Sequence, residues 1–215
     1  MKFYSTNGQS NPVSFREAVI KSLPADKGLY FPEQITPLET AFFDMLENLT
    51  LPEIGLEVLS QFCNKDIPES KLQEILIGAL DFPTPIMTIE KDIHTLELFH
   101  GPTYAFKDVG ARFLARCLGY FNETKNHEVT VLVATSGDTG GAVASGFYEV
   151  PGVNVVILYP SDKVSALQEK QLTTLGKNIR ALEVKGNFDD CQAMVKRAFL
   201  DEDINVKLNL SSANS

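Results

Sequence analysis

The stretch Leu96-Glu-Leu-Phe-His-Gly-Pro-Thr-Tyr-Ala-Phe-Lys-Asp108 carries the chain from a short apolar run through a turn into a helix. Gly101-Pro102 forms the turn, and Thr103 is expected to cap the helix that follows. Beyond Phe106, apolar side chains recur with the 3.6-residue period of a helix that buries one face. These are Val109, Phe113, Leu114, Cys117, Leu118 and Phe121. Lys107 therefore lies in the first turn of an amphipathic helix.

A lysine in that position runs against the usual charge preference of a helix. The positive end of the helix dipole disfavours the charged form of Lys107. Gly110 and Ala111 follow one turn later, with Ala115 beyond, and these small residues leave open space beside the lysine. A chemical role for Lys107 competes with the commoner case of a solvated surface lysine.

The polar neighbours of Lys107 have structural interpretations. Asp108 and Arg112 are four residues apart, so we expect them to pair on the exposed face of the helix. His100 lies beside Gly-Pro and is interpreted as a turn residue rather than a base. The chain has neither a Ser-His-Asp order nor a glycine-flanked serine elbow, so a hydrolase is not favoured.

Composition and charge exclude several classes of function. The 215 residues carry a net charge of -9 and no basic stripe, so nucleic acid is not an expected partner. No apolar run reaches membrane-spanning length, and no signal-peptide core is present, so no membrane partner is expected. Cys63, Cys117 and Cys191 are far apart and do not cluster with histidines, which indicates buried thiols without a metal site. A cytoplasmic location is expected; the oligomeric state stays open.

Residues 1–85 are expected to form a mostly helical α+β domain. Ser14-Phe-Arg-Glu17 is a capping box, and Gly28-Leu-Tyr-Phe-Pro32 is a short extended piece. Helical periods return at Leu56 to Phe62 and at Leu72 to Leu80. The two prolines of Asp81-Phe-Pro-Thr-Pro-Ile86 indicate a linker.

Residues 86–215 change to strands that alternate with helices, the pattern of an α/β fold. The expected strands are 129–134, 153–159, 179–184 and 206–210, and the expected helices are 140–148, 165–175 and 188–200. Nearly continuous apolar strands with helical crossovers predict a parallel sheet covered on both faces. Ligands of such sheets bind at the carboxyl ends of the strands.

The loop Thr135-Ser-Gly-Asp-Thr-Gly-Gly-Ala142 follows the first of these strands. Its hydroxyls and backbone N–H groups at a helix N-terminus would form an anion cradle. It matches neither the dinucleotide fingerprint nor the phosphate-loop motif. A tight turn whose glycines serve only helix–sheet packing is an equally good interpretation of this loop alone.

The next loop, Pro160-Ser-Asp-Lys-Val-Ser165, reaches the same edge of the sheet. It could hold a phosphate, but on its own a helix cap is the favoured interpretation. The segment Lys185-Gly-Asn187 is expected only to turn the chain. A lysine and an anion cradle at one edge suit a carbonyl cofactor held as an imine, since the amine needs a lowered pKa to attack.

These segments carry a resemblance to a known family. Phe99–Asp108, Ala134–Ala142, and Val156–Pro160 with Lys163-Val-Ser165 closely resemble the threonine synthases, pyridoxal-phosphate enzymes of fold type II. The N-terminal unit and the last segment, Asn209-Leu-Ser-Ser-Ala-Asn-Ser215, match as well. The resemblance therefore covers essentially the whole chain.

The resemblance implies a reaction and a role for each matching residue. The family converts O-phospho-L-homoserine and water into L-threonine and phosphate. Lys107 would bind pyridoxal 5′-phosphate as an imine and then act as acid and base. The other implied contacts are Phe106, Thr135 and Ser136 to the cofactor, Ser136, Gly137, Asp138 and Thr139 to the substrate carboxylate, and Lys163 and Ser165 to the substrate phosphate.

One departure from the family limits this expectation. The glycine-rich loop that binds the cofactor phosphate in the family, and its residue near the pyridine nitrogen, do not occur in these residues. The chain also stops just past a strand, so the sheet is expected to be truncated and the fragment to bind cofactor poorly and not turn over. The alternatives are another fold type II enzyme, such as a serine/threonine dehydratase, and a catalytically silent binding module. A nucleotide-binding domain is a more distant third.

Overall fold

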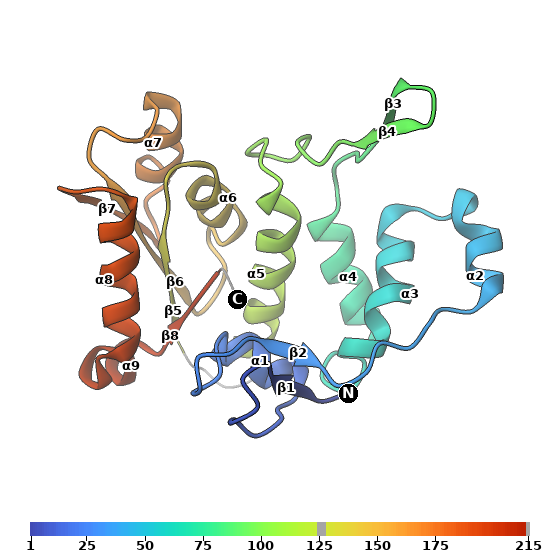
Figure 1. Cartoon of the computed structure of the whole chain (residues 1–215), viewed down its shortest axis with the longest axis horizontal. Helices are drawn as coiled ribbons and strands as arrows, with labels where there is room; N and C mark the ends of the chain where they lie inside the picture. The colour runs from blue at the N-terminus through green and yellow to red at the C-terminus, as the bar shows by residue number, and fades with distance from the viewer. Residues whose placement is uncertain (124–127, 214–215) are drawn as a thin grey trace. The chain divides into compact units, whose positions relative to one another are not determined.

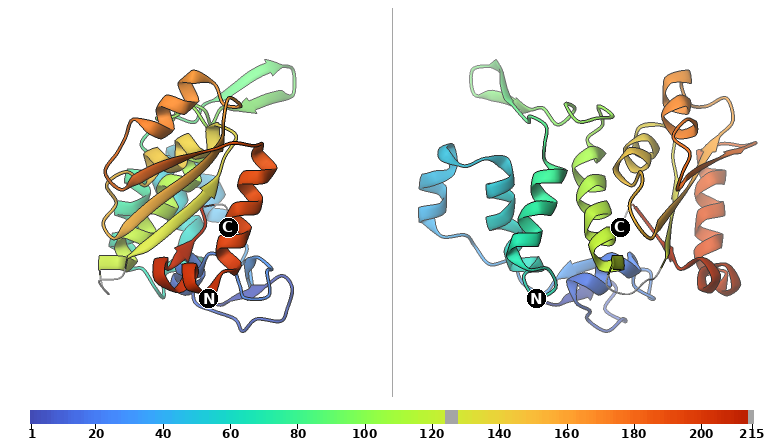
Figure 2. Two further views of the ribbon diagram at one scale, coloured as in Figure 1. Left: turned by 90° about the vertical axis from the view of Figure 1, so that its left-hand side faces the viewer. Right: turned by 180° about the vertical axis from the view of Figure 1, so that it is seen from behind.

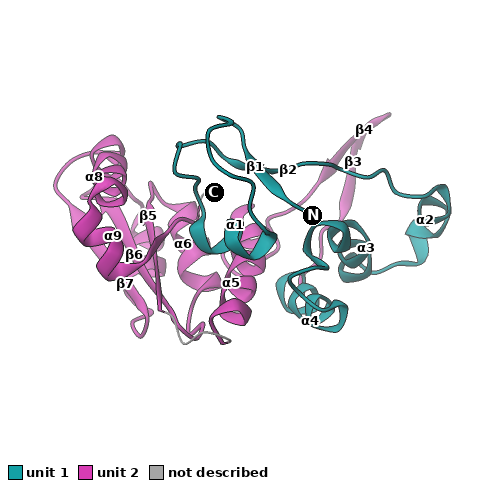
Figure 3. Cartoon of the chain, turned by 90° about the horizontal axis from the view of Figure 1, so that it is seen from below, with its two compact units in different colours: residues 1–81, 215 teal, residues 82–214 magenta. Residues whose placement is uncertain are grey.

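The computed structural model describes residues 1–123 and 128–213. It divides the chain into two compact units, Met1–Asp81 and Phe82–Asn214, coloured separately in Figure 3. We call them unit 1 and unit 2 and describe each by itself.

Unit 1 combines one small sheet with helices. The strands β1 (Phe3–Ser5) and β2 (Tyr30–Pro32) pair antiparallel. The helical elements are α1 (Phe15–Lys21), α2 (Thr40–Met45), the 3-10 turn η1 (Leu46–Asn48), α3 (Leu51–Cys63) and α4 (Glu69–Ala79). The predicted capping box of Ser14 and Glu17 is confirmed at the start of α1.

Asp26 fixes the loop that precedes β2. Its carboxylate accepts the Ser5 hydroxyl at 2.5 Å, the Gln9 N–H at 2.9 Å and the Gly28 N–H at 3.1 Å. The hydrogen bond from Ser5 is the main cause that lowers the pKa of Asp26 to about 2, helped by the N–H donors of Gly28 and Gln9.

Unit 2 is built on a parallel sheet. It opens with a hairpin of β3 (Ile86–Glu90) and β4 (Ile93–Leu96), whose residues are all exposed. The sheet has the order β7-β6-β5-β8. After the hairpin, the helices and strands of unit 2 are, in chain order, α5 (Lys107–Glu123), β5 (Val129–Ala134), α6 (Asp138–Gly146), β6 (Val153–Pro160), α7 (Ala166–Thr173), β7 (Ile179–Val184), α8 (Phe188–Leu200), α9 (Glu202–Leu208) and β8 (Leu210–Ser211).

Helices cover both faces of this sheet. Figures 1 and 2 show α8 on one side of the strands, with α6 and then α5 on the other. Every residue of β5 is buried, and Cys191 of α8 packs with Leu132 and Leu158 in the core. An ideal Cβ on Gly146 would lie 3.1–3.2 Å from backbone atoms of Ala111 and Arg112, so this glycine lets α5 approach α6 closely. The predicted α/β class with a parallel sheet is confirmed.

The structure corrects one expected strand. Residues 129–134 and 179–184 are strands and 188–200 is a helix, as predicted. The strand expected over 206–210 is wrong, because α9 runs to Leu208 and β8 covers only Leu210–Ser211. Asp201 accepts the N–H of Ile204 at 3.0 Å and starts the helix, and Asn209 ends it with a φ of 47°. These caps outweigh the strand propensity of the apolar residues.

Within the residues that the structure describes, no helix is long and apolar enough to cross a membrane. The same residues contain no group of three or more side chains placed to hold a metal ion.

Candidate active site

The carboxyl end of β5 lies where the order of the strands reverses. From β5 the chain steps outward to β6 and β7, and β8 then pairs with the opposite side of β5. Such a switch point is where open α/β sheets bind their ligands, because the flanking loops diverge there. The loop from Thr135 to Thr139 begins at this point.

Thr135 organises the loop from inside. Its hydroxyl oxygen accepts the N–H groups of Gly137 at 3.0 Å and Gly140 at 2.8 Å. The same hydroxyl donates to the Gly137 carbonyl at 3.1 Å, and the side chain is buried. All three of these hydrogen bonds of the Thr135 hydroxyl are made within the loop. The cofactor contact expected of Thr135 remains a prediction.

The loop presents N–H groups at the start of α6. In the described part of the chain, the N–H groups of Ser136, Asp138 and Thr139 have no hydrogen-bond acceptor. Ser136 is exposed, and Gly137 has a φ of 147°, which strongly favours glycine. Unpaired N–H groups at the positive end of a helix suit an anion.

The loop after β6 contacts the first loop through α7. Ser165 caps α7: its side chain accepts the N–H of Gln168 at 3.3 Å, so the cap interpretation is confirmed. Gln168 Nε2 donates to Asp138 Oδ1 at 2.7 Å. Lys163 is exposed on this loop.

Lys107 is the first residue of α5, so its predicted place in the first turn of a helix is confirmed. Burial lowers the pKa of its amino group, because a charged amine loses hydration there. Among the residues that the structure describes, no acidic or hydrogen-bonding partner contacts this amine. The expected open space is present at Gly110, where a Cβ would meet no atom within 4 Å, but not at Ala111 and Ala115, which are fully buried. The exposed ring of Phe106 precedes the lysine.

The turn before Lys107 is held by Asp108 and not by a Thr103 cap. The Thr103 prediction is wrong, because α5 begins four residues later and the Thr103 hydroxyl donates to Asp108 Oδ1 at 2.6 Å. Asp108 is fully buried, so its expected place with Arg112 on an exposed face is also wrong. Gly101 lies directly against this carboxylate. An ideal Cβ built on Gly101 would be 2.6 Å from Asp108 Oδ2, so a larger residue would not fit there. His100 pairs with Glu97 at 2.7 Å.

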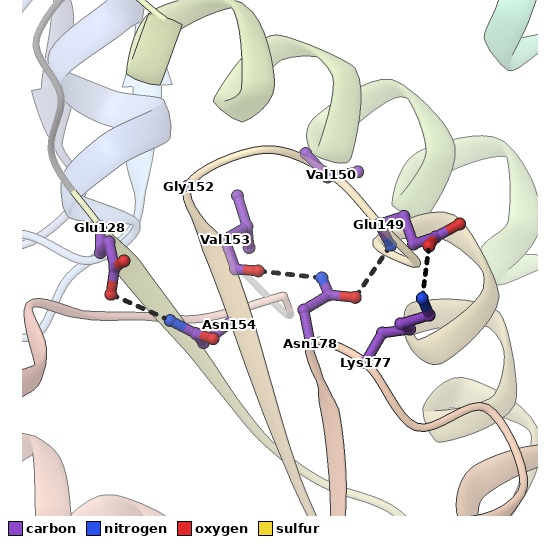
Figure 4. A pocket seen from close by; sticks show the side chains of 8 residues that line it. All are labelled: Glu128, Glu149, Val150, Gly152, Val153, Asn154, Lys177 and Asn178. Carbon is purple, nitrogen blue, oxygen red and sulfur yellow. Dashed lines mark hydrogen bonds and ion pairs between the residues drawn. The ribbon is translucent and has the colours of Figure 1, made fainter.

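A hollow lies at the opposite edge of the sheet, at the amino end of β6 (Figure 4). Asn178 donates to the carbonyls of Phe147 at 2.8 Å and Val153 at 2.9 Å. Lys177 pairs with Glu149 at 3.6 Å. These polar groups satisfy one another and fix a turn, so this hollow is not the candidate site.

Two family models together match almost the whole chain. Residues 2–80 match the threonine synthase N terminus, and residues 82–211 match the pyridoxal-phosphate dependent enzymes. The chain is 46% identical over 215 residues to threonine synthase of Escherichia coli K12 and 43% identical to that of Haemophilus influenzae. In both cases it covers 100% of itself and 50% of the relative. The chain thus spans about half the length of the curated relatives it matches.

Solved structures agree with these matches. The crystal structure of threonine synthase from Escherichia coli aligns with a TM-score of 0.89 at 45% identity, covering 100% of this chain and 50% of that one. The structure of PLP-bound threonine synthase from Brucella melitensis aligns with a TM-score of 0.93 at 36% identity, covering 100% and 48%. The fold expected from the resemblance is confirmed. With its α/β unit matched from residue 82 to 211, the chain belongs to the family of pyridoxal-phosphate dependent enzymes.

Proposed function

We propose that this chain carries the lysine-bearing part of a threonine synthase, which converts O-phospho-L-homoserine and water into L-threonine and phosphate. The observation that carries the proposal is Lys107, a partly buried amine without a partner among the described residues. The relatives named threonine synthase, at 37–46% identity over the chain, support this choice of reaction.

The residues present fit pyridoxal phosphate. The lowered pKa of Lys107 leaves more of the amine neutral, the form that reacts with an aldehyde. Open space beside Gly110 and the exposed Phe106 leave room and an aromatic face for a planar ring. The carboxylate of an amino acid bound there would find the unpaired N–H groups of the loop after β5.

Pyridoxal phosphate, when bound, supplies an electron sink for carbanions at the substrate's α and β carbons. Lys107 Nζ holds the cofactor and then moves protons to and from those carbons. This transfer needs a neutral amine as base and a protonated amine as acid, which a pKa lowered toward the working pH provides.

Other residues bind and orient the substrate. We propose that the N–H groups of Ser136, Asp138 and Thr139 bind its carboxylate, with Gly137 supplying the backbone conformation, at a φ of 147°, that the loop needs. Thr135 keeps this loop in shape through its three internal hydrogen bonds. Lys163 and the hydroxyl of Ser165 lie after β6, and we assign them to the substrate phosphate.

A small-molecule substrate and a cytoplasmic location complete the proposal. All three cysteines are free and buried, as in proteins of reducing compartments. A dehydratase of the same family is the second candidate, and the match of residues 2–80 to the threonine synthase N terminus favours the first.

Product analysis tests the proposal. The protein in its longest natural form is incubated with pyridoxal phosphate and O-phospho-L-homoserine, with Lys107→Ala as the control. Threonine and phosphate in equal amounts support the proposal. A keto acid would indicate the dehydratase instead, and a protein that binds cofactor at Lys107 without forming product would be a silent homologue.

A further inference from the structure

Gln168 of α7 joins the two loops at the carboxyl edge of the sheet. Its Nε2 donates to Asp138 Oδ1 at 2.7 Å across 30 residues of sequence. Its Oε1 accepts the N–H of Ser165 at 3.0 Å. One side chain therefore links the start of α6 to the start of α7.

Asp138 creates a difficulty for a loop that binds an anion. Its carboxylate stands on the first residue of α6, where the positive end of the helix attracts negative charge. Short acidic side chains also bind nearby backbone N–H groups readily. A carboxylate turned onto the free N–H groups of Asp138 and Thr139 would occupy the place of an incoming anion and repel it.

The hydrogen bond from Gln168 Nε2 to Asp138 Oδ1 opposes this rotation of the carboxylate. The amide of Gln168 lies directly over Gly137, since an ideal Cβ there would be 2.4–2.8 Å from three atoms of the amide. The capping box with Ser165 holds the backbone N–H and the side-chain Oε1 of Gln168. The buried Leu172 packs at Gly140 and gives α7 a second contact with α6 that does not involve Gln168.

We infer that Gln168 is a positioning residue, which holds the Asp138 carboxylate away from the loop N–H groups and so keeps them open for the substrate carboxylate. The identity of the anion rests on the proposed function. The shielding of the N–H groups from Asp138 does not depend on it.

The first test needs no ligand. Amide resonances of Ser136, Asp138 and Thr139 are recorded by NMR at neutral pH for the wild-type chain and for Gln168→Ala. We expect at least one of these amide protons to move downfield in Gln168→Ala, because the released carboxylate accepts it. Adding Asp138→Ala changes residue 138 itself, so the rescue is read from Ser136 and Thr139. Their amide resonances should return toward their wild-type positions.

The second test measures anion binding with sulfate, which keeps its charge around neutral pH. In Gln168→Ala the affinity read from the same amides should fall about tenfold, the effect of one competing charge-assisted hydrogen bond. Adding Asp138→Ala should bring it back to within about twofold of wild type. Gln171→Ala is the matched control: this glutamine lies one turn further on α7, near Gly141.

The outcomes separate the inference from the proposed function. Unchanged amides in Gln168→Ala, a loss that Asp138→Ala does not rescue, or an equal loss in Gln171→Ala would overturn the inference. A third outcome is that the amide resonances shift in Gln168→Ala and are rescued by Asp138→Ala, but the wild-type chain binds no sulfate. These results would uphold the shielding by Gln168. They would reject the loop as an anion site, and with it that part of the proposed function.

Discussion

Asp108 holds Thr103 through two hydrogen bonds, from the backbone N–H to Oδ2 at 2.9 Å and from the hydroxyl to Oδ1 at 2.6 Å. The carboxylate is fully buried and belongs to the residue after Lys107. The pair therefore fixes the turn that delivers the chain to the lysine.

Removing this carboxylate should destabilise unit 2. Asp108→Ala leaves the Thr103 N–H and hydroxyl without their acceptor, and we expect a loss of about 2–3 kcal/mol in the free energy of unfolding. Thr103→Val removes only the hydroxyl and should cost about 1 kcal/mol. Urea unfolding followed by circular dichroism measures both. Equal losses of unfolding free energy in the two variants would contradict a stabilising hydrogen bond from the Thr103 N–H to Asp108.

The lowered pKa of Lys107 predicts a pH dependence. Reductive labelling with pyridoxal phosphate and borohydride, located by mass spectrometry, should reach its maximum rate at a lower pH for Lys107 than for the exposed Lys207. The unfolded chain binds this proton more tightly, so the free energy of unfolding should rise as pH increases from the folded pKa to 10.5. Lys107→Met should remove that rise. Coincident pH profiles for the two lysines would disprove the effect of burial.

Gly110→Ala should stabilise α5 while harming the site. A Cβ at Gly110 meets no atom within 4 Å, so the change should add about 0.5–1 kcal/mol by restricting the unfolded chain. The added methyl group takes space beside Lys107, and labelling by pyridoxal phosphate should slow. Gly55→Ala in α3 is the control, because its Cβ would lie 3.2 Å from Leu76 Cδ2 and should bring less stability. Faster labelling in Gly110→Ala would show that this space is not used.

Asp26 should govern the acid stability of unit 1. Its folded pKa of about 2 lies below the unfolded value near 3.8. The stabilisation is therefore present above pH 3.8 and is lost as pH falls toward 2. In Asp26→Asn, unfolding curves measured between pH 2 and 6 should lack this component. Asp44→Asn, at an exposed carboxylate of α2, serves as control and should follow the wild type.

The elements whose conformation depends on near neighbours could be predicted from the sequence. The apolar runs of β5 and β7 and the amphipathic stripe of α8 were predicted to the residue, because period and propensity act over a few neighbours. Lys107 at the start of a helix and Ser165 as a cap followed from the same local rules. Local rules also failed at Val206, where the helix that starts at the Asp201 cap covers residues of an expected strand.

The meeting of groups that are distant in the sequence depends on the packing of the whole unit. The strand order β7-β6-β5-β8 places the Thr135 loop at a switch point, and no periodicity encodes strand order. Burial of Asp108 turned an expected surface charge into the anchor of a turn. The bond between Gln168 and Asp138 joins residues 30 apart, and it exists because α7 packs on α6. The sequence supplies such side chains, but their pairing depends on how the chain packs in space.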